Sequence, residues 1–320
     1  MTAMEPVDVK AVACGFETLR EAIGRLVVGQ EGAVRHAYIT LLASGHSLIE
    51  GVPGVAKTLL VRSLAAAVGV RFGRVQFTPD LMPSDVIGTT ILDPREGAVR
   101  FRPGPLFTDL LLADEINRAS AKTQAALLEA MQERSATVDG TSHALGPYFI
   151  VFATQNPVEH EGTYPLPEAE LDRFLFKIVM GYPSEEEETA ILARHHTDSW
   201  STALVPRVLE PNALEESREA VRRVIVREEV VAYVATLVRA TRADLNFALG
   251  ASPRAGVMLL RAAKANAAIE GRDFVLPEDV QEIFLPALRH RVQLDPAAEV
   301  EGLAVDQALT RTLQSLVVPR

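Results

Sequence analysis

The 320-residue sequence has almost no cysteine: Cys14 stands alone, so no disulfide can form within the chain. It also has no apolar run near the ~18 residues that a membrane-spanning helix needs. Residues 1–10 lack the apolar stretch behind a basic start that marks a secretory signal. These absences predict a protein of a reducing compartment without a membrane span, and we expect it in the cytoplasm.

The sequence has fewer basic than acidic residues: 32 Lys and Arg against 42 Asp and Glu, which gives a formal net charge of −10. Nucleic-acid-binding proteins usually show a basic footprint, so this balance argues against a general DNA-binding role. Hydrophobic residues make up 48% of the chain, which is an ordinary share for a globular protein. A length of 320 residues fits two or three units rather than one small domain.

Five short apolar segments alternate with helical patterns in the first half of the chain. They carry the residues typical of strands, and turn-forming residues bound them. This alternation predicts an α/β fold in which helices flank a parallel five-stranded sheet on both faces. The predicted strands are residues 47–50, 70–78, 110–113, 149–154 and 176–180.

Two segments interrupt the alternation, and we predict a projecting hairpin in each. One is an insert at residues 87–102, and the other, at 136–145, contains the strong two-residue turn Asp139-Gly140. Beyond residue 182 strand signals become sparse and helical patterns follow one another. We therefore predict an α/β domain over residues 1–182 and a smaller all-α domain over 183–320.

Residues 51–58 form a glycine-rich loop between a predicted strand and a predicted helix, which is the context of a Walker A phosphate-binding loop. Its backbone N–H groups would surround phosphates, Lys57 would contact the β- and γ-phosphates, and Thr58 would give its hydroxyl to Mg²⁺. The common pattern has glycine before the lysine, whereas Ala56 stands here, so we predict that this position does not need glycine's backbone angles. The predicted cradle comprises Gly51, Val52, Pro53, Gly54, Val55, Ala56, Lys57 and Thr58.

An apolar strand ending in two acids, Asp114 and Glu115, is the Walker B pattern. In doubly wound sheets ligands bind at the carboxyl ends of the strands. We predict that Asp114 holds Mg²⁺, directly or through water, and that Glu115 orients and deprotonates the attacking water. Asn156 follows the next strand, where it could polarise that water or touch the γ-phosphate. Asparagine also favours turns before a proline such as Pro157, so a turn-forming role is the alternative for Asn156.

Taken together, these motifs resemble those of the MoxR-type AAA+ ATPases. The similarity is dense over residues 27–180 and looser towards the end of the chain, and Ala56 is what this family shows. The segments that carry it are Gly-Val-Pro-Gly-Val-Ala-Lys-Thr (51–58), Ala-Asp-Glu-Ile-Asn-Arg-Ala (113–119), Ala-Thr-Gln-Asn-Pro (153–157) and Glu-Gly-Thr-Tyr-Pro-Leu-Pro-Glu-Ala-Glu-Leu-Asp-Arg-Phe (161–174).

The resemblance assigns roles that composition could not. It makes Asn156 the sensor 1 residue and Arg173 an arginine finger offered to the neighbouring subunit's nucleotide. For Arg173 the alternative is a structural salt bridge to Asp172 or another acid, and Arg118 is a weaker candidate for the finger. It makes Arg254 the sensor 2 residue, acting on its own or a neighbour's nucleotide.

The resemblance also points to residues near the nucleotide base, which would be Val27, Val28, Gly29 and Gln30. The helix near 213–224 and the insert at 87–102 match elements that are specific to this clade.

The resemblance also implies an activity and partners. We expect ATP hydrolysis with Mg²⁺ in a ring-shaped homo-oligomer, which the family resemblance implies is a hexamer. This ring would remodel a protein client of the von Willebrand factor A type or of another kind. Nucleic acid is an unlikely partner. The competing hypotheses are a nucleic-acid motor, a metal-chelatase-type motor subunit and a non-catalytic ATP-gated scaffold.

Overall fold

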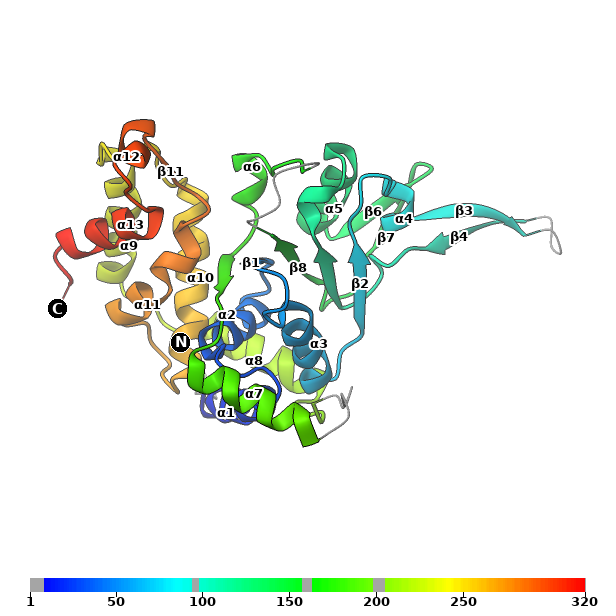
Figure 1. The fold of residues 1–320 in the computed structure, drawn as a ribbon, viewed down its shortest axis with the longest axis horizontal. Helices are drawn as coiled ribbons and strands as arrows, with labels where there is room; N and C mark the ends of the chain where they lie inside the picture. The colour runs from blue at the N-terminus through cyan, green and yellow to red at the C-terminus, as the bar shows by residue number, and fades with distance from the viewer. Residues whose placement is uncertain (1–8, 94–97, 157–162, 198–204, 320) are drawn as a thin grey trace, which may run out of the picture.

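The computed structural model describes residues 9–93, 98–156, 163–197 and 205–319. Its centre is a sheet of five parallel strands in the order β2-β5-β8-β1-β9 (Figure 1). Each strand overlaps a predicted one, so the α/β fold class is confirmed. The strands are β1 (Ser47–Gly51), β2 (Phe72–Gln76), β5 (Leu110–Asp114), β8 (Ile150–Gln155) and β9 (Phe176–Met180).

Helices cover both faces of the sheet. Those from the first half of the chain are α1 (Val9–Gly24), α2 (Glu31–Leu42), α3 (Lys57–Val68), α4 (Pro83–Ile87), the 3₁₀ turn η1 (Ile116–Arg118), α5 (Ala121–Glu133) and α6 (Glu168–Leu171). Leu110 and Leu112 of β5 join the core beneath α1, α2 and α3, whereas Leu111 and Ala113 join the core beneath α5. Because successive side chains of a strand point to opposite faces, a strand buried on both faces reads as a continuous apolar run.

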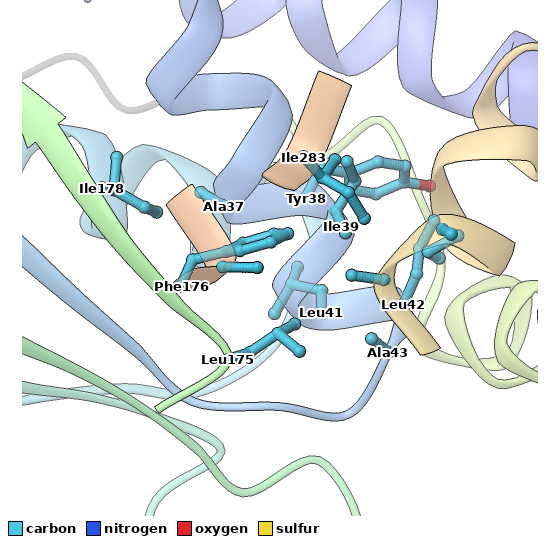
Figure 2. Packing of buried hydrophobic residues seen from close by; sticks show 14 of the residues in the cluster. Ala37, Tyr38, Ile39, Leu41, Leu42, Ala43, Leu175, Phe176, Ile178 and Ile283 are labelled. Carbon is cyan, nitrogen blue, oxygen red and sulfur yellow. The ribbon is translucent and has the colours of Figure 1, made fainter. Parts of the chain in front are cut away.

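The core beneath α2 is packed by large side chains from distant parts of the chain. Figure 2 shows the apolar side chains of α2 against Leu175, Phe176 and Ile178 at β9, with Ile283 arriving from the C-terminal half. Phe176 and Leu175 are fully buried. Burying a phenylalanine or leucine side chain contributes about 1.5–3 kcal/mol each, so this contact fixes α2 on the sheet.

Two hairpins leave the sheet, as predicted. The first, β3 (Gly88–Asp93) with β4 (Ala98–Pro103), extends far from the rest of the molecule in Figure 1. The second pairs β6 (Ser135–Val138) with β7 (Thr141–Ala144) around the turn at Asp139 and Gly140, both of which have positive φ.

The C-terminal half is helical, as predicted, apart from one short strand pair. Helices α9 to α13 gather on one side of the molecule, whereas α7 and α8 lie with α1 (Figure 1), and α8 packs on α1, α2 and α10. The predicted division after residue 182 stays a prediction. The elements are α7 (Glu185–Thr197), α8 (Pro211–Arg223), α9 (Glu228–Ala243), β10 (Phe247–Leu249), α10 (Pro253–Ile269), α11 (Pro277–Leu288), β11 (Gln293–Leu294), α12 (Pro296–Val300) and α13 (Val305–Ser315). Over the described residues, no helix combines the length and apolarity needed to cross a membrane.

A buried ion pair fastens this helical half to the sheet. Arg291, whose side chain is 1% exposed, donates from Nε to Asp172 Oδ1 over 2.8 Å and from Nη1 to the carbonyl of Leu175 over 3.1 Å. Asp172 also accepts the hydroxyl of Ser252 over 2.9 Å. Burial lowers the pKa of Arg291 to about 10 even beside this carboxylate. Asp172, at the end of α6, therefore connects the segment that leads into β9 with Arg291 and with the start of α10.

Three histidines lie inside the fold with depressed pKa values. Burial, together with nearby arginines, lowers the pKa of His36 to about 4, the pKa of His46 to about 3 and the pKa of His290 well below its usual value. His46 Nδ1 accepts the N–H of Val151 over 2.9 Å, which requires a neutral ring. All three are therefore neutral in the folded protein near pH 6.

We expect the folded state to lose stability in mildly acidic solution. Because these folded pKa values lie below the unfolded value of 6.5, the unfolded chain takes up protons first, and the stability is present above pH 6.5 and lost below it. The free energy of unfolding should fall by about 4 kcal/mol between pH 7.5 and 5.5 for three such groups. Urea unfolding at each pH measures this.

Removing one of these histidines tests their share in the pH dependence. His36→Gln should reduce it by about one third, since one of the three groups is removed. A free energy of unfolding that stays constant across this pH range would contradict the prediction.

Candidate nucleotide site

The carboxyl ends of the strands open onto a cavity of about 730 Å³. Lys57, Thr58, Asp114, Glu115 and Asn156, predicted from three separate motifs, all line it. Further walls come from the loop residues Pro53, Gly54, Val55 and Ala56 and from Leu26, Val28, Gln30, Pro183, Ile191 and Leu192. The fold thus brings the polar residues of these three motifs into one cavity.

The predicted phosphate-binding loop joins β1 to α3. Gly54 has φ +90°, and Lys57 begins α3 and donates from Nζ to the carbonyl of Gly51 over 2.5 Å. Gly51 and Val52 start the loop without lining the cavity. Free amides and the positive end of the helix dipole at the start of α3 favour a bound anion.

Ala56 corrects one prediction. Its φ of 66° and ψ of 24° are left-handed, so the position does use backbone angles that favour glycine. The left-handed conformation costs an L-residue roughly 1–2 kcal/mol. The prediction was wrong because it took the presence of a Cβ as proof of an ordinary conformation, whereas the loop closure imposes the turn regardless.

The two acids at the end of β5 are held by neighbours that the sequence analysis did not single out. Asp114 accepts the hydroxyl of Thr154 over 2.6 Å and pairs with Arg74 of β2 over 2.7 Å. The Thr154 oxygen also accepts the backbone N–H of Glu115 over 2.8 Å. Glu115 has φ 56°, a strained conformation that often accompanies function, and it pairs with Arg118 over 3.1 Å. The register of the strands could have identified Thr154. Ala113 of β5 pairs with Ala153 of β8, and Asp114 and Thr154 are the residues that follow this pair.

Thr58 and Asp114 fit a magnesium ion. Both present oxygen donors to the same cavity, and Mg²⁺ prefers one or two protein oxygens together with phosphate oxygens and waters. Over the described residues there is no group of three or more His, Cys, Asp or Glu side chains suited to holding a metal ion without phosphates. The donor set therefore suits a metal that arrives with a nucleotide.

The residues predicted near the base border the same cavity. Val28 and Gln30 line it, and Gln30 donates from its side chain to the carbonyl of Gly181 over 3.0 Å. Gly29 does not line the cavity; its φ is +73°, and a Cβ there would meet the carboxylate of Glu187 in α7. Val27 is buried. The loop before α2 is thereby tied to the start of α7.

Arg173 and Arg254 lie elsewhere, together, in a pocket of about 220 Å³ that also contains Arg134 and Arg261. This pocket includes Ser44, just beyond the end of α2, whereas Gln30 at the start of α2 lines the nucleotide cavity. A 12-residue helix is ~18 Å long. The two pockets therefore lie towards opposite ends of α2 and have no lining residue in common.

Among the described residues, Asp172 is not an ion-pair partner of Arg173, although the charge of Arg173 acts on the carboxyl group of Glu170. Asp172 is paired with Arg291, and Arg173 instead donates to the carbonyl of Leu128 over 3.3 Å and to the side chain of Gln132. Its Nε is buried and has no hydrogen-bond partner. Arg254 is exposed on the first turn of α10, where Ser252 caps the helix by accepting the N–H of Ala255 over 3.2 Å.

Comparison with known proteins agrees with this geometry. Residues 46–176 match the ATPase family associated with various cellular activities (AAA), and residues 239–312 match the AAA lid domain. A crystal structure from Cytophaga hutchinsonii that carries an ATPase assignment superposes with a TM-score of 0.90 at 39% identity, covering 98% of this chain and 97% of that one. Fold and site define an AAA+ P-loop ATPase with an α/β core and a helical lid.

Relatives of nearly equal length identify the family within the AAA+ class. The chain is 45% identical to the uncharacterized protein YeaC of Bacillus subtilis, over 93% of each chain. It is 43% identical to Chaperone MoxR1 of Mycobacterium tuberculosis, over 98% of this chain and 86% of the relative. It is 35% identical to Protein MoxR of Methylorubrum extorquens, over 96% and 94%. The chain belongs to the MoxR family of AAA+ ATPases.

Ala56→Gly should stabilise the protein while nucleotide binding is retained. Glycine removes the left-handed strain of roughly 1–2 kcal/mol and loses about 0.5–1 kcal/mol through greater freedom of the unfolded chain. We expect a net gain of about 0.5–1 kcal/mol in the free energy of unfolding, measured with urea. Ala66→Gly within α3 is the matched control and should destabilise by about 1 kcal/mol. Equal losses in both variants would rule out strain at Ala56.

Proposed function

We propose that this protein hydrolyses ATP with Mg²⁺ in a ring, a hexamer by family resemblance, whose active sites are composite. The observation that carries the proposal is the division of the predicted residues between two places. Five lie in the cavity at the strand ends, and the two arginines lie together at the far end of α2. Such a division suits a site completed by the next subunit.

Within one subunit, each cavity residue has a distinct task. The loop amides and Lys57 bind the β- and γ-phosphates, while Thr58 and Asp114 hold the metal. The metal held by Thr58 and Asp114 would offset the negative charge of the phosphates. Glu115 takes the proton of the attacking water, and Asn156 orients that water. Glu115 must first leave Arg118, 3.1 Å away, so this ion pair keeps the base occupied until substrate and partner are in place.

Arg173 and Arg254 act on the nucleotide of the neighbouring subunit. A head-to-tail interface that places one subunit's arginine pocket against the next subunit's nucleotide cavity generates a closed ring if the rotation closes. An arginine supplied in trans can raise the hydrolysis rate by roughly 10³ to 10⁵. The buried, unpartnered Nε of Arg173 supports a side chain poised for another acceptor.

The work done with this energy is the remodelling of protein partners. One relative is named a chaperone, and the hairpin β3–β4 offers a surface for such contacts. Leu92 and Val99 on this hairpin are 64% and 67% exposed. Exposed apolar residues gathered on a projecting element are typical of interaction sites. A von Willebrand factor A-type client, in a cytoplasmic setting, remains a prediction from family resemblance.

Mixed assemblies test the composite site. Glu115→Gln and Arg173→Ala should each lose ATP hydrolysis as pure samples, because one lacks the base and the other the finger. Co-assembled in equal amounts, they should recover about a quarter of the wild-type rate, since each site draws half from one subunit and half from the next. Steady-state phosphate release at concentrations above assembly measures this.

The control is a mixture of Glu115→Gln with the double variant Glu115→Gln, Arg173→Ala, which should recover nothing. Arg311→Ala, an exposed arginine on α13, should keep the wild-type rate. An Arg173→Ala sample with the wild-type rate, or a mixture no faster than its parts, would refute action in trans. Arg254→Ala in place of Arg173→Ala asks the same of Arg254.

A further inference from the structure

A second cavity, of about 740 Å³, lies at the end of α2 away from the nucleotide cavity. Its walls come from the last residues of α2, from α8 and from α10. Its volume is within the range of sites for organic ligands. The ATP hydrolysis proposed above uses none of its side chains.

Three arginines of this cavity direct guanidinium N–H groups at the end of α2. Cations there offset the negative end of the helix dipole, which is equivalent to about half an elementary charge. Three full positive charges greatly exceed that need. The hydrogen bonds run from Arg218 Nε to the carbonyl of Leu41 (2.9 Å), from Arg261 Nη2 to that of Ala43 (2.5 Å) and from Arg134 Nη2 to that of Ser44 (3.2 Å).

Carboxylates do not balance this charge. Glu215 lies 3.7 Å from Arg218 but is shared with Arg222 at 3.0 Å. Over the described part of the chain, no carboxylate forms an ion pair with Arg134, Arg261 or the nearby Lys264. Within the described chain, Glu215 and the ring of Tyr148, whose centroid lies 5.3 Å from the Arg218 guanidinium carbon, offset only part of this positive charge.

Arg218 is the group that most needs a further partner. Its side chain is only 2% exposed, its Nη1 donates to the carbonyl of Pro147 over 3.3 Å, and its Nη2 is buried with no hydrogen-bond partner. Burial, with the charges of Arg134 and Arg222 also acting, lowers the pKa of Arg218 to about 10. A buried cationic N–H without an acceptor is destabilising, so an acceptor at this position would relieve a real cost.

The remaining walls are hydrocarbon. Val221, Val226, Val257 and Leu260 line the cavity beside the cations. We propose that this cavity binds an organic carboxylate, whose head group pairs with the guanidinium groups that line the cavity and whose apolar body lies along Val257 and Leu260. The planar guanidinium fork matches a carboxylate in geometry as well as charge.

The position of the site suggests what the ligand would influence. Arg134 and Arg261 line both this cavity and the pocket of Arg173 and Arg254. Gln132, two residues before Arg134, accepts a hydrogen bond from Arg173. A bound carboxylate would therefore contact the residues that surround the proposed finger. Any effect on hydrolysis rests on the proposed function, whereas binding does not.

Calorimetric titration with sodium octanoate tests binding, with saturating ADP and Mg²⁺ present to occupy the nucleotide cavity. We expect one saturable site per chain. 1-Octanol, which lacks the charge, and inorganic phosphate, which lacks the apolar body, should bind at least about tenfold more weakly. Arg218→Met should also weaken octanoate binding by at least about tenfold, as loss of a hydrogen bond to a charged group predicts.

Val257→Glu provides a second variant that should fold normally, because Val257 is 59% exposed. Its carboxylate would compete for the same cations and repel octanoate, so binding should again fall. Arg311→Met should bind octanoate as the wild type does. The proposal is overturned if the wild type binds octanoate no better than a dissociation constant of about 10 mM, or if both cavity variants bind it with wild-type affinity.

Discussion

The nucleotide site depends on the parallel pairing of β5, β8 and β1. Phe152 of β8 faces both Leu112 of β5 and Ser47 of β1, so the three strands end at one edge of the sheet. Each strand end delivers one part of the site: the phosphate-binding loop, the two acids and Asn156. A slip of one residue in any pair would turn its side chains to the opposite face. The two apolar cores, which each require alternate residues of the same strands, prevent that slip.

Helix α2 separates two charged environments, and its dipole favours an anion at its start and cations at its end. Its start borders the cavity proposed for phosphates, and its end faces a group of arginines. Asp172 completes the arrangement, because it binds both Arg291 and Ser252 and so places the first turn of α10 beside the segment that carries Arg173. Breaking a buried ion pair of this kind costs about 3–5 kcal/mol. The carboxylate of Asp172 therefore contributes to holding the arginine pocket together, beside the hydrogen bond of Arg291 to the carbonyl of Leu175.

Strain and unbalanced charge are concentrated where function is proposed. Ala56 and Glu115 both have left-handed backbone angles at the corners of the nucleotide cavity, and such conformations persist only when the surrounding structure imposes them. The hydrogen bonds of Thr154 to Asp114 and Glu115 supply part of that constraint. At the other end of α2, Arg218 keeps a buried N–H without an acceptor. Both features lower the stability of the folded subunit.

The sequence by itself determined the five strands, the hairpins, the α/β class and the positions of Lys57, Asp114, Glu115 and Asn156, because each rests on a local pattern of apolar residues, turns or motif spacing. The catalytic roles of these residues remain predictions. Only the tertiary structure decided the conformation of Ala56, the partners of Asp114, the pairing of Asp172 with Arg291 and the gathering of Arg134, Arg173, Arg254 and Arg261. Most of these features join residues far apart in the chain, such as Asp172 and Arg291, which are separated by 119 positions. Local propensity carries no information about such contacts, which depend on how the strands and helices pack.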